Sequence, residues 1–260
     1  MKKCLFCPNR ADSLEHVLPQ WLLRCISPET EGAFPVQVGR YVEGQGDCDE
    51  RKHVSLNFKA RIVCVECNNG WLRKLESEVC QILKPLTGKQ FPVLADIYFD
   101  ELRRHSHVIA RWLTKTALTT SMALPAKQRL SASFADEIMR GNAPAEVWID
   151  VADAELPCVA AAITKTFPII NGNIPIGVRD CGDMCFQFCL QINHLLLRVG
   201  LSPHAEVRYT GPKPFRLFPK ADQQVPEYFR FRDVNYFLHS VTLKTWEGCS
   251  GEVPLCETTK

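Results

Sequence analysis

The chain has 260 residues, of which 46% are hydrophobic and 23% charged, an ordinary composition for a globular protein with one large domain or two small ones. Its formal net charge of +2 excludes a strong overall basic field, so local patches would have to hold any nucleic-acid partner. No apolar run approaches the roughly 18 residues of a membrane span, and we expect a cytoplasmic protein without a membrane partner. In a reducing compartment, 13 cysteines indicate metal binding and buried thiols rather than disulfides.

The first part of the chain is predicted to combine turns, short strands and two helices. Residues 1–30 indicate a cysteine turn, a short strand or turn, and a helix. A polar, glycine-rich loop follows, with a short strand near 36–42. A strand over 56–63 comes next, where apolar and polar residues alternate. From residue 68 to about 83, apolar residues at 3.6-residue spacing predict a helix, which Pro85 ends.

A second region is predicted from residue 84 to 260, at first helical and then rich in strands. Its strongest helix covers residues 101–123, and a shorter helix follows it. A strand is predicted over 147–151. Residues 185–201 are also expected to be extended, with a break or bulge at Asn193 and His194.

Two Cys-x2-Cys pairs are the most specific chemical signal in the chain. Cys4 and Cys7 open it, and Cys64 and Cys67 follow the strand predicted over 56–63. Each pair makes a tight turn whose two sulfurs can reach one metal ion, and four thiolates form a closed tetrahedral Zn²⁺ site. Because four protein ligands leave no open position for a substrate, we expect a structural zinc. The alternative interpretation is that the four thiols are simply buried.

Between the two pairs lies Glu15-His16, and Asn68 directly follows the last cysteine. A carboxylate and an amide oxygen suit a hard divalent cation such as Mg²⁺, which keeps several waters and takes further oxygens from phosphate. Histidine titrates near neutral pH and can remove a proton from water. Neighbouring strand residues point to opposite faces, so we expect a turn or distorted backbone to bring Glu15 and His16 to one ion. The alternatives are an ordinary surface pair for Glu15-His16 and a helix N-cap for Asn68.

The order Cys-x2-Cys, then Glu-His with a proline three residues later, then Cys-x2-Cys-Asn, resembles the zinc-containing HNH endonucleases, or ββα-metal finger nucleases. The run CNNGWL, which starts at Cys67, is similar to one bacterial branch of that family. The resemblance covers residues 1–83, and we recognise none in residues 84–260. It implies an α+β protein in which a ββα-metal finger module with a Cys4 zinc site precedes a mixed helical and β-rich domain.

The resemblance also implies a role for each polar residue near the cysteines. Glu15 stands where the family binds its catalytic divalent ion, Mg²⁺ or Mn²⁺, and Asn68 where the family has a second ligand for that ion. His16 stands where the family has the general base that deprotonates the attacking water. The family has a middle asparagine that orients this base, for which Asn57 is the nearest candidate. Asn69 is a further candidate for a supporting part.

Taken together, the resemblance implies a metal-dependent endonuclease that hydrolyses DNA and leaves 5′-phosphate and 3′-hydroxyl ends. The setting would be bacterial restriction, anti-phage defence or mobile-element biology. RNA stays open as the substrate, and a homodimer would pair two active sites to cut both strands. A second hypothesis is a zinc-dependent module that binds nucleic acid or protein without cutting. A third is a degenerate nuclease that keeps the fold as a scaffold.

Two further groups of residues each allow two interpretations. A basic row at helical spacing lies on the strongest predicted helix: Arg103, His107 and Arg111, with Arg104 and Lys115 nearby. This row suits phosphate contacts, but an ordinary solvated helix face is the favoured interpretation. Trp21 and Trp71 are expected to anchor the core of the small N-terminal domain rather than to stack on bases.

Overall fold

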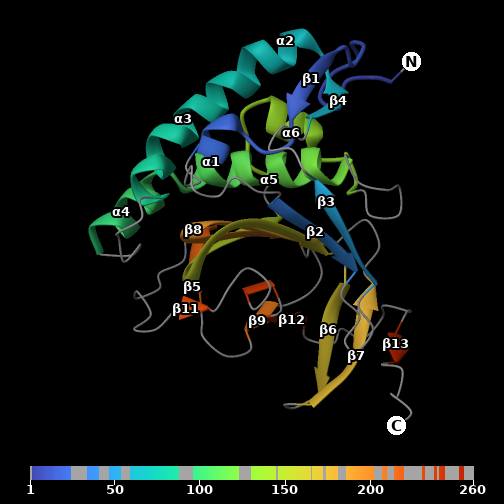
Figure 1. Ribbon diagram of the computed structural model, residues 1–260, viewed down its shortest axis with the longest axis vertical. Coiled ribbons are helices and arrows are strands. Elements are labelled where there is room, and N and C mark those ends of the chain that lie inside the picture. The colour runs from blue at the N-terminus through green and yellow to red at the C-terminus, as the bar shows by residue number, and fades with distance from the viewer. Residues whose placement is uncertain are drawn as a thin grey trace.

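The computed structural model describes residues 2–24, 34–40, 47–53, 59–87, 96–122, 130–144, 146–164, 166–171, 174–180, 186–201, 207–209, 214–219, 230–231, 237–238, 240–243 and 252–254. Helices gather at one end of the molecule and most of the strands at the other (Figure 1). The sheets are mainly antiparallel, with two parallel pairings. The fold is therefore α+β, which confirms the predicted class.

Five short elements come first in the chain: β1 (Ser13–His16), α1 (Gln20–Arg24), β2 (Phe34–Arg40), β3 (Asp47–His53) and β4 (Lys59–Val63). Strands β2 and β3 pair with each other, and β1 pairs antiparallel with β4. The register of β1 against β4 shifts between Ser13 and Glu15. The irregularity precedes Glu15, whereas Glu15 and His16 pair in regular register with Ala60 and Lys59.

Three consecutive helical segments follow β4: α2 (Val65–Cys67), the π-helical turn η1 (Asn68–Leu72) and α3 (Arg73–Leu83). The helix begins at Val65 and not at the predicted residue 68, because the second cysteine turn is itself helical. Cys64 caps it with its sulfur, which accepts the Cys67 N–H at 3.4 Å. Inside η1, Gly70 has φ −91° and ψ −110°, which kinks the helix. The 3₁₀ turn η2 (Lys84–Thr87), which contains the predicted breaker Pro85, ends this run.

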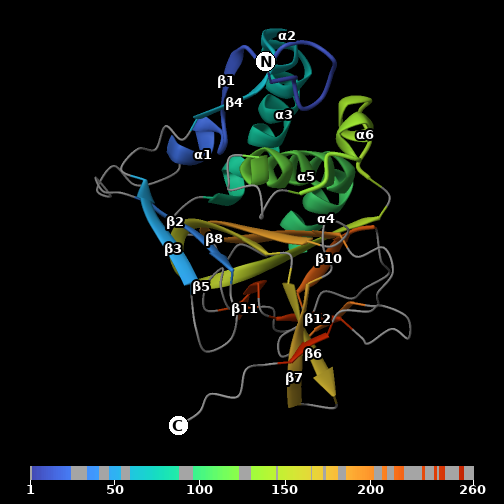
Figure 2. The ribbon, with the colours of Figure 1, turned by 90° about the vertical axis from the view of Figure 1, so that its right-hand side faces the viewer.

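The helical layer is completed by α4 (Asp96–Arg104), α5 (Ser106–Met122) and α6 (Ala135–Met139). The single helix predicted over 101–123 is thus two helices that meet at His105. Helix α5 lies between α3 and the sheet below it (Figures 1 and 2), and this position buries it on nearly all sides. Its buried threonines donate to its own backbone, for example Thr114 to Ala110 at 2.7 Å and Thr116 to Trp112 at 2.9 Å.

The largest strands are β5 (Val147–Thr164) and β8 (Phe186–Leu201), which form a long antiparallel pair. The predicted bulge is present: Asn193 has φ 55°, and the register shifts opposite it between Asp153 and Cys158. The remaining strands of this sheet are β10 (Phe215–Phe218) and β11 (Arg230–Phe231). A second sheet has the order β13-β7-β6-β12-β9: Glu252–Pro254, Ile174–Asp180, Thr166–Asn171, Val241–Leu243 and Val207–Tyr209.

Apolar packing joins the helices to the first sheet. One cluster of buried side chains begins at Cys4 and Phe6, continues through α3 and α5, and reaches Leu217 on β10. It therefore crosses the domain boundary predicted between residues 83 and 84, and the division into 1–83 and 84–260 stays a prediction. Within the described ranges, no helix combines the length and the apolar character needed to cross a bilayer.

Candidate functional site

The four cysteines of the two Cys-x2-Cys pairs come together as predicted. All four Sγ atoms lie within 4.8 Å of one another, with Cys7 3.5 Å from Cys64 and 3.7 Å from Cys67. In a tetrahedral site with Zn–S bonds of about 2.3 Å, sulfurs lie about 3.8 Å apart. The cluster thus has the dimensions for a metal ion such as Zn²⁺. No second group of three or more ligands of this kind occurs among the residues that the structure describes.

The pKa values of three of these thiols differ from the ordinary value in opposite directions. Burial raises the pKa of Cys64 to about 11 and raises the pKa of Cys67 as well. For Cys4, burial acts in the same direction, but N–H donors of Phe6 and Cys64 outweigh it and lower the pKa. A bound Zn²⁺ would supply the positive charge that buried thiolates require, with release of protons on binding.

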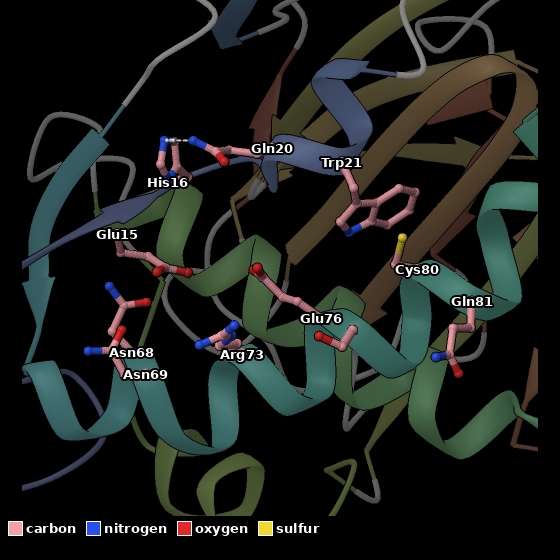
Figure 3. A pocket seen from close by; sticks show the side chains of 11 residues that line it. Glu15, His16, Gln20, Trp21, Asn68, Asn69, Arg73, Glu76, Cys80 and Gln81 are labelled. Carbon is pink, nitrogen blue, oxygen red and sulfur yellow. Dashed lines mark hydrogen bonds between the residues drawn. The ribbon is translucent and has the colours of Figure 1, made fainter.

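Next to the cluster, an open cleft of about 610 Å³ lies between β1 and α1 on one side and η1 and α3 on the other (Figure 3). Eleven residues line it: Glu15, His16, Gln20, Trp21, Asn68, Asn69, Arg73, Glu76, Ser77, Cys80 and Gln81. It brings together the three predicted catalytic residues, Glu15, His16 and Asn68, and the supporting candidate Asn69. Asn57, the candidate for the middle asparagine, lies outside the described residues.

Glu15 is 4% exposed and has an unexpected partner. The Lys115 ammonium, on helix α5, lies 2.7 Å from Oε1 of Glu15 and 2.7 Å from Oε1 of Glu76. Lys115 itself is fully buried. Burial alone would lower its pKa, but the carboxylates of Glu76 and Glu15 outweigh burial and raise it, so the side chain stays charged. Within the described residues, Lys115 is the only partner of the Glu15 carboxylate, and it contacts Oε1.

The favoured solvated-face interpretation of the basic row holds for His107 and for Arg104, which is 71% exposed, but not for Lys115, which lies on the covered part of helix α5. Besides the buried Lys115, Arg111 donates from Nε to the Ile138 carbonyl at 2.7 Å, and its guanidinium lies 5.0 Å from the centre of the Trp71 ring. Burial lowers the pKa of Arg111. The Arg103 guanidinium lies 4.7 Å from the centre of the Phe215 ring. Lys115 therefore lies inside the protein, and Arg103 and Arg111 are half-buried against aromatic rings.

His16 lies at the end of β1 and is half-buried. The side-chain amide nitrogen of Gln20 lies 3.1 Å from its Nε2 (Figure 3). An amide that donates to Nε2 leaves the proton of the neutral ring on Nδ1. If the amide turns and accepts from Nε2–H, Nδ1 is free to take a proton from water. Gln20 was missed at the sequence level, where its only signal is its place four residues after His16.

Asn68 is held by a short hydrogen bond from its Nδ2 to Ser13 Oγ at 2.6 Å. Its Oδ1 has no partner in the part of the chain that the structure describes. Its backbone is helical (φ −63°, ψ −50°) and its N–H donates to the Cys64 carbonyl at 3.0 Å. The N-cap alternative for Asn68 is therefore wrong, since the helix has already begun at Val65.

The two tryptophans pack against the core, as predicted. Trp71 meets Phe6 edge to face, with ring centres 4.9 Å apart. Trp21 lies 6.0 Å from Trp112 between ring centres, and it also forms part of the cleft wall.

Comparison of the chain with protein-family models, with curated proteins and with solved structures gives no significant match in any of the three. We therefore infer function from the residues of the cleft and of the cysteine cluster.

Proposed function

We propose that this chain is a metal-dependent endonuclease of the HNH type that hydrolyses phosphodiester bonds in DNA. The observation that carries this proposal is the common location of Glu15, His16 and Asn68 in one open cleft beside the four-cysteine cluster. Strand β1 supplies the first two residues, and the helix that starts at the cluster supplies the third. The antiparallel pair β1–β4 followed by this helix has the order of a ββα unit and supports the proposal.

The donor set of the cleft fits a hard divalent ion. Oε2 of Glu15 and Oδ1 of Asn68 would hold Mg²⁺ or Mn²⁺, with phosphate and water as the remaining ligands. Such an ion stabilises negative charge on the phosphate and on the leaving 3′ oxygen. The structural Zn²⁺ would remain in the four-cysteine cluster, where it links the N-terminal turn to the start of the helix.

His16 acts as the general base in this proposal. It takes a proton from water, and the water oxygen attacks phosphorus as the bond from phosphorus to the 3′ oxygen breaks. The 3′ oxygen then takes a proton from solvent, so the products carry a 5′-phosphate and a 3′-hydroxyl. Gln20 keeps the imidazole ring in one orientation through its hydrogen bond to Nε2.

Residues 84–260 would recognise, position or regulate the substrate in a setting of restriction, anti-phage defence or mobile-element biology. A homodimer would place two clefts on the two strands of a duplex. A binding module without catalysis is the second candidate. It is favoured by the existing partners of the three residues: Lys115 for Glu15, Gln20 for His16 and Ser13 for Asn68.

The test is cleavage of supercoiled plasmid by zinc-loaded protein, with and without Mn²⁺ or Mg²⁺. Wild type is compared with His16→Ala and with the matched control His105→Ala, whose ring pairs with Glu101 away from the cleft. We expect nicking or linearisation that requires the added ion. His16→Ala should lower the rate by about 10²- to 10⁴-fold, the usual contribution of a general base, while the control keeps wild-type activity.

Cleavage that survives in His16→Ala would rule out the mechanism. Absence of cleavage by zinc-loaded wild type on plasmid and on RNA, together with retention of either nucleic acid in a gel-shift assay, would establish the binding module instead.

A further inference from the structure

We propose that Lys115 is a positioning residue of the cleft, whose ammonium group occupies the cation position between Glu15 and Glu76 and thereby restricts the cleft to one divalent ion. This inference rests on the proposed nuclease function. It adds two residues, Lys115 and Glu76, for which the HNH resemblance of residues 1–83 implies no role. Lys115 belongs to helix α5, which lies outside the segment that the resemblance covers.

The geometry is that of a cation between two carboxylates. Oε1 of Glu15 and Oε1 of Glu76 each lie 2.7 Å from the same Lys115 nitrogen. Two carboxylates that converge in this way are a common arrangement for a bridging divalent ion. Because the ammonium already lies between them and pairs with Oε1, we infer that an ion binds Glu15 through its other oxygen, Oε2; Glu15 and the remaining ligand candidate Asn68 both line the cleft (Figure 3).

The two carboxylates that line the cleft, Glu15 and Glu76, share the Lys115 ammonium of α5, and Arg73 of α3 adds a further positive charge to the lining. The ammonium is withdrawn from solvent, since Lys115 is fully buried while the Glu76 side chain is 24% exposed. Removal of the Lys115 charge would leave the carboxylates of Glu15 and Glu76 close together without a cation between them, and charges at such short distances interact strongly.

Lys115 also orients Glu15. The lysine side chain comes from the buried part of α5 and contacts Oε1 of Glu15 through a charge-assisted hydrogen bond. The second region of the chain thus sets the direction in which Oε2 points. A lysine with only a structural role would affect folding, but it would not control how many ions bind or how tightly.

The experiment is calorimetric titration of Mn²⁺ into zinc-loaded full-length protein without nucleic acid. Wild type is compared with Lys115→Met and with Lys84→Met, which removes the same charge from an exposed position in the turn after α3. We expect Lys115→Met to bind Mn²⁺ at least about tenfold more tightly, with a second ion between Glu15 and Glu76. Plasmid cleavage at saturating Mn²⁺ should nevertheless be slower, since Glu15 is no longer oriented. Lys84→Met should match wild type.

The double variant Lys115→Met/Glu76→Gln restores the charge balance and should bring Mn²⁺ binding back to one ion. Unchanged or weaker Mn²⁺ binding by folded Lys115→Met would overturn the inference and leave the nuclease proposal intact. If Lys115→Met does not fold, Lys115→Gln, which keeps hydrogen-bond donors, replaces it with the same expectation. If Lys115→Gln and the double variant also fail to fold, Lys115 has a purely structural role and the inference is overturned. Wild type that binds no Mn²⁺ would also overturn the inference, which expects one ion in the wild-type cleft, and the plasmid cleavage assay would then decide the nuclease proposal separately.

Discussion

Two groups of buried charges among the described residues use their carboxylate oxygens differently. One group lies on the face of the β5–β8 sheet that points away from α5. There both oxygens of Asp150 are fully engaged: Oδ2 accepts from Nε and Nη2 of Arg198 at 3.1 and 2.7 Å, and Oδ1 accepts from Arg216 at 2.6 Å and from Tyr209 at 2.8 Å. Burial raises the pKa of Tyr209, so its hydroxyl stays protonated and can donate.

The other group is Lys115 with Glu15 and Glu76 at the cleft. Here only Oε1 of Glu15 has a partner among the described residues, and Glu76 is partly exposed. A buried carboxylate whose acceptor capacity is filled has no further bond to offer, whereas one with an open oxygen can take a ligand. The comparison therefore predicts a role in stability for the Asp150 group and supports the proposed role in ion binding for the Glu15 group.

The largest expected effect concerns the four-cysteine cluster that holds the cleft in place. Cys64→Ser should abolish zinc binding and unfold the N-terminal module, because structural zinc in small domains contributes about 10–16 kcal/mol of apparent binding energy. Zinc content and circular dichroism measure this. Cys80→Ser, a change outside the cluster, is the control and should retain its zinc. Full zinc occupancy in Cys64→Ser would show that the cluster is not the metal site.

Arg198→Met tests the structural side of the comparison. It removes two donors from Asp150, and we expect a loss of about 3 kcal/mol in the free energy of unfolding, near the low end for a broken buried pair, since Arg216 and Tyr209 still donate. Denaturant titration measures it. Zinc content and Mn²⁺ binding should match wild type under native conditions. A change in Mn²⁺ affinity would mean that the two groups are coupled, which would break the comparison.

Gly200→Ala tests how tightly side chains pack around the Asp150 group, which consists of Asp150, Arg198, Tyr209 and Arg216. Gly200 lies opposite Trp148 in the β5–β8 pair, and a Cβ atom at Gly200 would overlap the Trp148 ring. That ring also covers Arg198 and Arg216, whose guanidinium carbons lie 5.2 and 5.1 Å from its centre. We expect a loss of about 1–3 kcal/mol on thermal or denaturant unfolding, typical of overpacking. A variant as stable as wild type would mean that the ring has room to move.

The smallest effect is expected at Gln20, on the cleft side. Gln20→Ala removes the hydrogen bond that orients His16, worth about 1–1.5 kcal/mol, and should slow plasmid cleavage by roughly tenfold. The free energy of unfolding should change little, because this contact is exposed. Gln81→Ala, at the far end of the same cleft, is the matched control. Equal effects of the two changes would argue against a role of Gln20 in orienting the base.

Much of the fold was predictable where the signal is local. The helix after the cysteines, strand β8 and the bulge at Asn193 follow from apolar periodicity and from a residue that tolerates positive φ, whereas only the first five residues of β5 were predicted. The helix after the cysteines was predicted to start at residue 68, three residues too late, because a pattern of apolar residues does not show that Cys64 acts as a cap. The helix predicted over 101–123 is interrupted at His105, a position that carries no breaker residue.

The sequence by itself determined the four-cysteine cluster and the candidates Glu15, His16 and Asn68, because cysteine spacing and adjacency in the chain are local properties that survive in any compatible fold. Tertiary structure alone decided the partners of these residues. Lys115 is a hundred positions from Glu15, and on a helix with other cations nothing in its neighbourhood distinguishes it from a solvated lysine. Only the position of α5 between α3 and the sheet buries this charge and directs it into the cleft, which makes the carboxylates of Glu15 and Glu76 its required partners.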